Sequence, residues 1–207
     1  MQNFVKDWME KQSDWRFPML FLSPSHPDYT EYCLKSNLVY VCTNNFSREN
    51  IVDHVKKILR KPNLSAPSMF RQKPLSHEGK IDNDTIPQNQ IGLAVAVNFF
   101  NYRPLEVMRE YLTEMHNILR PSGVFIFTYN NCDLPGSVRN VEKTMYSYTP
   151  GGLVQAMVQG LGFEILNVVD YEDVNVSWLE IKKPGELKTM RGGQDLAKII
   201  KHPTDVI

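Results

Sequence analysis

Residues 108–130 read MREYLTEMHNILRPSGVFIFTYN, and this stretch decides the fold. Apolar residues recur three and four positions apart in its first part, and the same spacing extends back to Pro104, a residue type common at helix starts. Arg120-Pro121-Ser122-Gly123 then predicts a tight turn, and the apolar run over 123–128 predicts a buried strand. We therefore expect a helix joined to a strand by a short turn.

Strand and helix patterns alternate over the rest of the chain. Strands are predicted over 17–22, 37–42, 91–100, 163–170 and 174–181. Helices are predicted over 1–15, 28–36, 47–59 and 150–160, the last with a core face of Leu153, Val154, Met157, Val158 and Leu161. This alternation favours an open, mostly parallel α/β sheet flanked by helices. The last two strands are separated by three residues, so we expect them to form an antiparallel hairpin.

The region 60–90 carries four prolines and little periodicity, so it is predicted to be mostly loop. Residues 56–80 hold seven Lys or Arg against one acid, Glu78. Such a basic segment suits nucleic acid, an acidic protein partner or plain exposure to water. The predicted organisation is an N-terminal helical arm at 1–16, an α/β domain at 17–182 and a C-terminal arm at 183–207.

Composition excludes several classes of protein. The chain has 207 residues, 42% of them hydrophobic, and 23 basic residues balance 23 acidic ones, so net charge indicates no partner. Its longest apolar run is too short to cross a bilayer, and its first residues lack the apolar core of a secretion signal. Three widely spaced cysteines indicate reduced thiols, which predicts a cytoplasmic protein. The five histidines show no metal-ligand spacing, so no metal site is expected.

The helix, turn and strand of 108–130 resemble the "helix, Leu-x-Pro-Gly-Gly, strand" passage of class I S-adenosylmethionine (SAM)-dependent methyltransferases. The terminal hairpin on a mostly parallel sheet is similar to the same fold, and the resemblance covers residues 17–182. It implies a Rossmann-like sheet and, in an active member, SAM as cofactor. The resemblance also implies a glycine-rich loop after the first strand, where the cofactor approaches the backbone.

The residues at the implied cofactor positions depart from the family pattern. The first strand ends at Leu22, and Ser23-Pro24-Ser25-His26-Pro27 follows without a glycine. The family's second strand ends in an acid that holds the ribose, whereas this chain has Asn44 and Asn45, which are also ordinary turn residues. Asp82 or Asp84 is the candidate for the acid that contacts adenine, although a solvated acidic turn explains both.

The fourth strand is followed by Asn98-Phe99-Phe100-Asn101-Tyr102. Amino-methyltransferases have an (Asp/Asn)-Pro-Pro-(Tyr/Phe) motif there, whose polar side chain and backbone carbonyl hold the target amine. By resemblance, Asn98 and Tyr102 are candidates for positioning a methyl acceptor, while the two phenylalanines also suit core packing. The polar residues 129–133 after the fifth strand would line the same rim, or simply begin a loop.

Two functions follow from these departures. The first is a non-catalytic interaction or structural module of a larger assembly, with a degenerate cofactor site that binds no cofactor. Its terminal arms would then dock a protein partner or a second copy. The alternative is an active SAM-dependent methyltransferase with a divergent cofactor loop. A different nucleotide at the same position is a third possibility.

Overall fold

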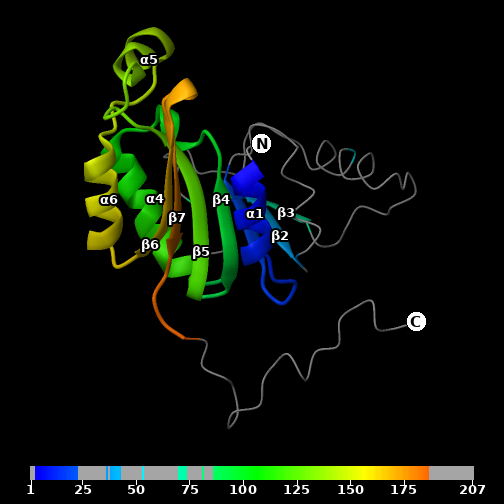
Figure 1. Cartoon of the computed structure of the whole chain (residues 1–207). Coiled ribbons are helices and arrows are strands. Elements are labelled where there is room, and N and C mark those ends of the chain that lie inside the picture. The colour runs from blue at the N-terminus through cyan, green and yellow to red at the C-terminus, as the bar shows by residue number, and fades with distance from the viewer. Residues whose placement is uncertain are drawn as a thin grey trace.

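A seven-stranded sheet in the order β3-β2-β1-β4-β5-β7-β6 forms the centre of the protein (Figure 1). In the computed structural model, the described residues are 3–22, 36, 38–42, 53, 70–73, 81 and 86–186. The strands are β1 (Met19–Leu22), β2 (Val39–Cys42), β3 (Phe70–Lys73), β4 (Ile91–Ala96), β5 (Leu119–Asn130), β6 (Glu164–Tyr171) and β7 (Val176–Lys182). β7 pairs antiparallel with both β5 and β6, and the other pairings are parallel. The mostly parallel sheet and its closing hairpin are therefore confirmed.

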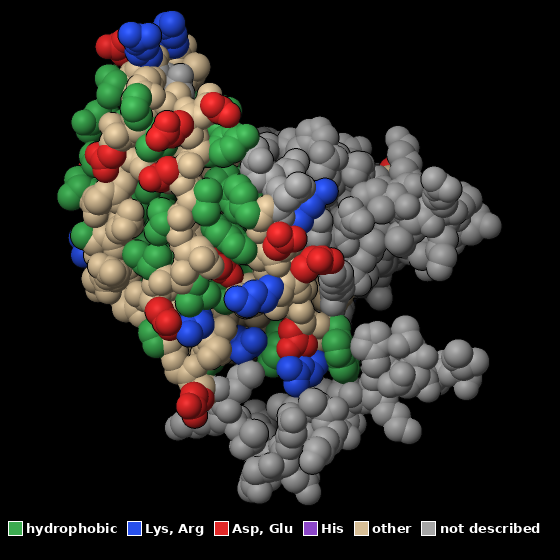
Figure 2. Space-filling model, in the orientation of Figure 1, with side chains coloured by type: hydrophobic (Ala, Val, Ile, Leu, Met, Phe, Trp, Pro, Cys, Tyr) green, Lys and Arg blue, Asp and Glu red, His purple; other side chains and the backbone are tan. Residues whose placement is uncertain are grey.

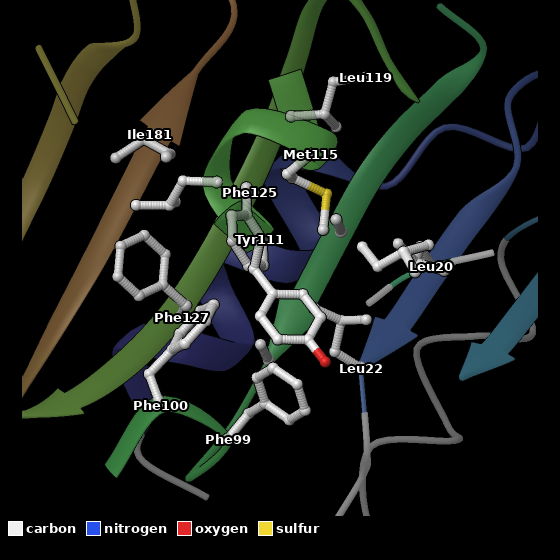
Figure 3. Close-up of a cluster of buried hydrophobic side chains, with 14 of the residues drawn as sticks. Leu20, Leu22, Phe99, Phe100, Tyr111, Met115, Leu119, Phe125, Phe127 and Ile181 are labelled. Atoms are coloured by element: carbon white, nitrogen blue, oxygen red, sulfur yellow. The ribbon is translucent and has the colours of Figure 1, made fainter. Parts of the chain in front are cut away.

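Helices cover both faces of this sheet. α1 (Asn3–Gln12) packs on one face through Val5 and Met9, which contact the strands in one core cluster. α4 (Leu105–Ile118) and α6 (Gly151–Gly160) pack on the other face, where the larger aromatic cluster lies (Figure 3). Figure 2 shows the α1 face, with hydrophobic side chains across its middle and charged ones toward its upper and lower ends. Alternate side chains of each strand thus supply two separate cores.

The turn at 120–123 lies inside β5 rather than before it, so the predicted boundary was wrong. Ile91 pairs with Leu119 and Leu93 with Val124, which makes the intervening residues a bulge in a continuous strand. Ser122 takes the left-handed conformation, with φ of 61°. A Cβ on Gly123 would lie 2.8 Å from the carbonyl oxygens of Arg120 and Ile91, so this position has room only for glycine.

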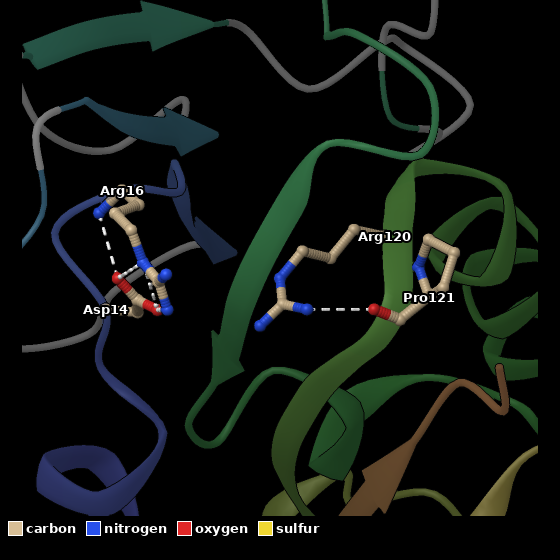
Figure 4. A network of polar contacts seen from close by, with 4 residues as sticks. All are labelled: Asp14, Arg16, Arg120 and Pro121. Carbon is tan, nitrogen blue, oxygen red and sulfur yellow. Dashed lines mark hydrogen bonds and ion pairs between the residues drawn. The ribbon is translucent and has the colours of Figure 1, made fainter. Parts of the chain in front are cut away.

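The bulge directs Arg120 toward the connection between α1 and β1 (Figure 4). Its guanidinium lies 4.0 Å from the centre of the Phe17 ring and donates a 2.9 Å hydrogen bond to the carbonyl of Pro121. Nearby, Arg16 forms a 2.7 Å ion pair with Asp14. Burial lowers the pKa of Arg120. Through the contact of Arg120 with Phe17, the bulge therefore connects the N-terminal end of β5 to the segment between α1 and β1.

Four elements differ from the prediction. β3 lies in the region predicted to be mostly loop; as an edge strand with the sequence FRQK, it has no apolar alternation to reveal it. α5 (Ser137–Thr144) was missed because it lacks a continuous apolar stripe. β4 ends at Ala96, and Phe100–Tyr102 form the 3-10 helix η2. On α6, Leu153 is 54% exposed instead of facing the core. The helices predicted at 28–36 and 47–59 and most of the C-terminal arm fall outside the described residues.

Candidate functional site

The carboxyl ends of β1 and β4 meet at the point where the strand order reverses. β1 pairs with β2 on one side and with β4 on the other, all parallel, so the chain leaves these two strands in opposite directions. Ligands of open α/β sheets bind outside the strand ends at such a point. Leu22 ends β1 there, and the segment 97–103 follows β4 at the same rim.

Of the predicted cofactor residues, Leu22 belongs to the described part of the chain. Its side chain is buried in the core cluster that also holds Phe99 and Tyr111 (Figure 3), and its contact with a cofactor stays a prediction. The other candidates lie outside the described residues and stay predictions: Ser23, Asn44, Asn45, Asp82 and Asp84.

Asn98 and Tyr102 both lie after the end of β4 with exposed side chains, Tyr102 within η2, and their role toward an acceptor stays a prediction. Asn98 takes the left-handed conformation, its backbone N–H donates to Thr128 Oγ1 at 2.6 Å, and its amide oxygen accepts from Asn101 Nδ2 at 3.3 Å. Tyr102 is 55% exposed and meets the Tyr146 ring edge to face at 4.9 Å. The hydrogen bond with Tyr146 raises the pKa of Tyr102, and burial adds to this. Between them, Phe99 and Phe100 are core residues.

Arg103 is a candidate that the sequence did not reveal. Its guanidinium carbon lies 3.5 Å from the centre of the Phe99 ring, and the guanidinium donates a hydrogen bond to the Phe99 carbonyl. Burial lowers the pKa of Arg103. Among the described residues no carboxylate pairs with it. A lone arginine before Pro104 carries no sequence signal, because only the packing shows that its charge is partly buried and that no carboxylate of the described residues pairs with it.

The rim after β5 is organised by one buried side chain, Asn131. Its amide nitrogen donates to Ser177 Oγ at 2.8 Å and to Asp170 Oδ1 at 3.4 Å, which ties β5 to the hairpin. Its amide oxygen accepts the backbone N–H groups of Asp133 and Gly151, both at 3.0 Å. The loop-start interpretation of 129–133 therefore fits Asn131 better than substrate contact.

A second anchor at the same rim is Asn130, whose amide nitrogen donates to the Ser147 carbonyl at 3.1 Å. The backbone N–H of Ser147 in turn donates to the Asn101 carbonyl at 2.7 Å. Asn130 and Asn131 are both buried, with at most 4% exposed. These bonds join the β4 loop, the end of β5 and the segment before α6 into one braced rim.

A hollow of about 430 Å³ opens next to this rim, between the N-terminal ends of α4 and α6. It is lined by Pro104, Leu105, Glu106, Ser147, Tyr148, Pro150 and Leu153. Within the described part of the chain, no cluster of three metal-ligating side chains occurs. No described helix is long and apolar enough to span a membrane.

Sheet order, antiparallel β7 and helices on both faces define this chain as a protein of the class I methyltransferase fold. Solved structures show the same architecture at low sequence identity. One is a chain of the complex between the Haloferax volcanii Trm112 methyltransferase activator and its methyltransferase (TM-score 0.63, 10% identity, 87% of this chain and 89% of that one). Another is magnesium protoporphyrin IX methyltransferase from Synechocystis, solved with bound S-adenosylhomocysteine (TM-score 0.61, 10% identity, 87% and 81%).

The same fold also occurs in a protein with a different activity. The [4+2]-cyclase SpnF matches with a TM-score of 0.60 and 13% identity, over 88% of this chain and 81% of that one. Neither a protein-family model nor a curated protein sequence matches this chain. Identities of this size carry the fold alone, and function has to be argued from the residues at the site.

Proposed function

We propose that this protein is a non-catalytic interaction or structural module built on the methyltransferase fold, with a degenerate cofactor site. One observation carries the proposal: the segment that follows β1 at the switch point, Ser23 to Pro27, contains no glycine and two prolines. Glycine lets a ligand approach the backbone closely, and each proline removes an N–H donor. The segment therefore offers side chains where the fold's cofactor needs bare backbone.

The end of β2 supports the same proposal. β2 ends at Cys42, and the next polar residues are Thr43, Asn44 and Asn45. An asparagine has one acceptor oxygen and no charge, whereas a carboxylate accepts from both ribose hydroxyls with charge-assisted bonds. The missing glycines and the missing acid would both lower the affinity for the cofactor. Their effects would add, because each removes favourable contacts with a different part of the ligand.

Calorimetry with SAM and with S-adenosylhomocysteine tests the proposal. We expect no heat of binding and no thermal stabilisation at millimolar ligand, because a ligand stabilises only a state that it binds. Circular dichroism of the same sample verifies that the protein is folded. Micromolar binding of either compound would overturn the proposal. As a gain-of-function control, Asn45→Asp combined with Ser23→Gly and Ser25→Gly should raise affinity if these losses are the cause.

One observation favours the alternative, an active SAM-dependent methyltransferase. Arg103 holds a partly buried positive charge with no acidic partner among the described residues, at the rim where a cofactor would lie. A buried charge is costly without a partner, and a ligand carboxylate would supply one. Asn98 and Tyr102 on the same loop would then position the acceptor.

A pair of ligands separates this alternative from the first proposal. S-adenosylhomocysteine carries an amino-acid group with a carboxylate and an ammonium, and methylthioadenosine is the same thionucleoside with a methyl group in place of that amino acid. If the alternative holds, the protein binds the first more tightly, and Arg103→Met removes that preference while the exposed Arg109→Met keeps it. If neither compound binds, or if Arg103→Met leaves the preference intact, Arg103 takes no part in cofactor binding.

The partners of the module are part of the proposal. The arms at 1–16 and 183–207 are candidates for docking a protein or a second copy, although α1 already packs on the sheet through Val5 and Met9. The basic segment 56–80, of which Arg71 is exposed on β3, is the candidate for nucleic acid. Gel shifts at two salt concentrations test the latter, because phosphate contacts weaken steeply with salt.

A further inference from the structure

Arg103 is held in a fixed position at the end of the loop after β4. Its backbone N–H donates to the Phe100 carbonyl at 3.2 Å, and Pro104 follows it with a φ of −57°. Its half-buried guanidinium is stacked on the Phe99 ring, and the guanidinium carbon lies 5.8 Å from the centre of the Tyr111 ring. A guanidinium placed in this way is ordered before a ligand arrives, so it loses little conformational freedom on binding.

Most of the hydrogen-bonding capacity of this guanidinium is unused. An arginine carries five N–H donors in a planar fork. Within the described part of the chain, the Arg103 side chain donates to the Phe99 carbonyl, and no carboxylate of that part pairs with it. The fork matches the two oxygens of a carboxylate, which accept parallel, charge-assisted hydrogen bonds. The remaining donors therefore indicate a ligand with negatively charged oxygens.

The Tyr111 hydroxyl is a second donor near Arg103. The Tyr111 ring packs edge to face on the Phe99 ring at 4.9 Å, and its hydroxyl points toward Leu22 at the end of β1 (Figure 3). Tyr111 is 2% exposed, and its hydroxyl has no hydrogen-bond partner among the described residues. Burial raises the pKa of Tyr111, although the charge of Arg103 opposes this rise, so the hydroxyl keeps its proton. An unpaired buried hydroxyl is destabilising, and a ligand oxygen would supply the acceptor that it lacks.

The charges of these two donors select the class of ligand. One guanidinium and one neutral hydroxyl balance a single negative charge, which is the charge of a carboxylate. A phosphate monoester carries about 1.5–2 charges at neutral pH, and the exposed Glu106, three residues after Arg103, would repel the excess. The hydroxyl lies below the surface, so a free small acid reaches it more easily than a carboxylate on a folded partner does.

We propose that Arg103 and Tyr111 form a binding subsite for a small organic monocarboxylate at the switch point. The guanidinium binds the two carboxylate oxygens, and the hydroxyl donates to one of them. The subsite requires no nucleoside, so it is compatible with a module that binds no SAM. Acetate is the simplest probe of this class, and we expect it to bind with a dissociation constant of about 1–10 mM.

Nuclear magnetic resonance on the full chain, with isotope-labelled arginine, tests the subsite directly. Sodium acetate is added to about 100 mM at neutral pH, while sodium chloride keeps the ionic strength constant, so that general screening does not change. The Arg103 Nε–H signal, identified by its absence in Arg103→Met, should shift and reach saturation. The signal of Arg109, an exposed arginine on α4, should not saturate.

Tyr111→Phe separates binding from folding, because the two effects have opposite signs. Loss of the hydroxyl should weaken acetate binding about 5- to 10-fold, since one hydrogen bond to a charged group is lost. The same loss should leave the Tm unchanged or raise it, because a buried unpaired hydroxyl is removed. Tyr148→Phe removes an exposed hydroxyl outside the subsite and should change neither quantity.

Four results would overturn the proposal. An Arg103 signal that responds to acetate no more than the Arg109 signal shows that there is no subsite. A Tyr111→Phe variant with wild-type affinity removes the hydroxyl from it. Inorganic phosphate that saturates the Arg103 signal below the acetate concentration assigns another class of ligand, and a glutamate peptide with blocked ends that binds more tightly than acetate assigns a protein partner. Acetate contains no nucleoside, so these results leave the test with S-adenosylhomocysteine unchanged, and the two proposals fail separately.

Discussion

Replacing Gly123 with alanine should destabilise the protein through two backbone contacts. The new Cβ would lie 2.8 Å from the carbonyl oxygens of Arg120 and Ile91, and ordinary contacts begin at 3.4 Å. Both neighbours are backbone atoms, and Ile91 belongs to the β4–β5 pairing, so neither can swing away as the end of a side chain could. Such overpacking costs about 1–3 kcal/mol, and the loss of glycine's freedom in the unfolded chain offsets about 0.4–1 kcal/mol. With the midpoints of these two ranges, about 2 and about 0.7 kcal/mol, we expect a net loss of about 1.3 kcal/mol.

Thermal unfolding at 5 μM protein measures this change. For a chain of this length, about 1.3 kcal/mol corresponds to a Tm lowered by about 3–5 °C. Gly152→Ala is the matched control, because its Cβ meets nothing within 4 Å on an exposed helix position. That control should leave the Tm unchanged or raise it slightly, because Gly152 lies in the first turn of α6, where helix propensity counts for less than in a helix interior. A Gly123→Ala variant that melts within 1 °C of the wild type would refute the argument from the bulge.

Three further substitutions test other contacts. Asn131→Ala removes four hydrogen bonds at a buried position and should cost about 2–4 kcal/mol in urea unfolding; a loss below about 1 kcal/mol would show that the rim is not braced by this amide. Lys183→Met removes the ammonium that donates to the carbonyls of His116 and Leu119 at the end of α4, and should cost about 1–2 kcal/mol. Burial and Lys183 lower the pKa of His116 in the folded state, so the neutral imidazole is favoured there. Its contribution to stability is present above the ordinary value of 6.5 and is lost as pH falls below it, and His116→Gln should flatten that decline in melts from pH 8 to 5.

The elements that the sequence predicted share one property: their apolar pattern is set by the same core that the structure shows. The stripe of α4 and the apolar runs of β4 and β5 face two buried clusters, so periodicity and burial report the same fact. α5 was missed because none of its described residues belongs to either cluster, and β3 was missed because its four residues, FRQK, show no apolar alternation. β3 is held by backbone pairing at the sheet edge, and backbone bonds leave no trace in residue type.

The turn at 120–123 shows a different limit. Arg-Pro-Ser-Gly predicts a reversal, and Ser122 does take a left-handed conformation. The chain nevertheless stays in the sheet, because Lys183 pairs with two consecutive residues of the bulge. The Lys183 carbonyl accepts from the Ser122 N–H, and the Lys183 N–H donates to the Gly123 carbonyl, each at 2.9 Å. Lys183 lies sixty residues further along the chain, so the local sequence at 120–123 cannot indicate this pairing.

The residues of the candidate site also fall into two groups: some are placed by the local sequence, and others take their role from contacts with distant parts of the chain. Asn98 and Tyr102 could be predicted to lie on the rim, since a strand end places the loop that follows it. The roles of Arg103 and Asn131 could not, because both depend on contacts made across the fold: an aromatic face for the one, a hairpin and a helix start for the other. The rim after β5 uses its amides to brace the fold, so the candidate residues of the proposed site belong to the loop after β4 and to the segments after β1 and β2. In the proposed function, the segment after β1 lacks a glycine and Thr43-Asn44-Asn45 after β2 lacks an acid, so Arg103 is the described side chain on which the test of cofactor binding depends.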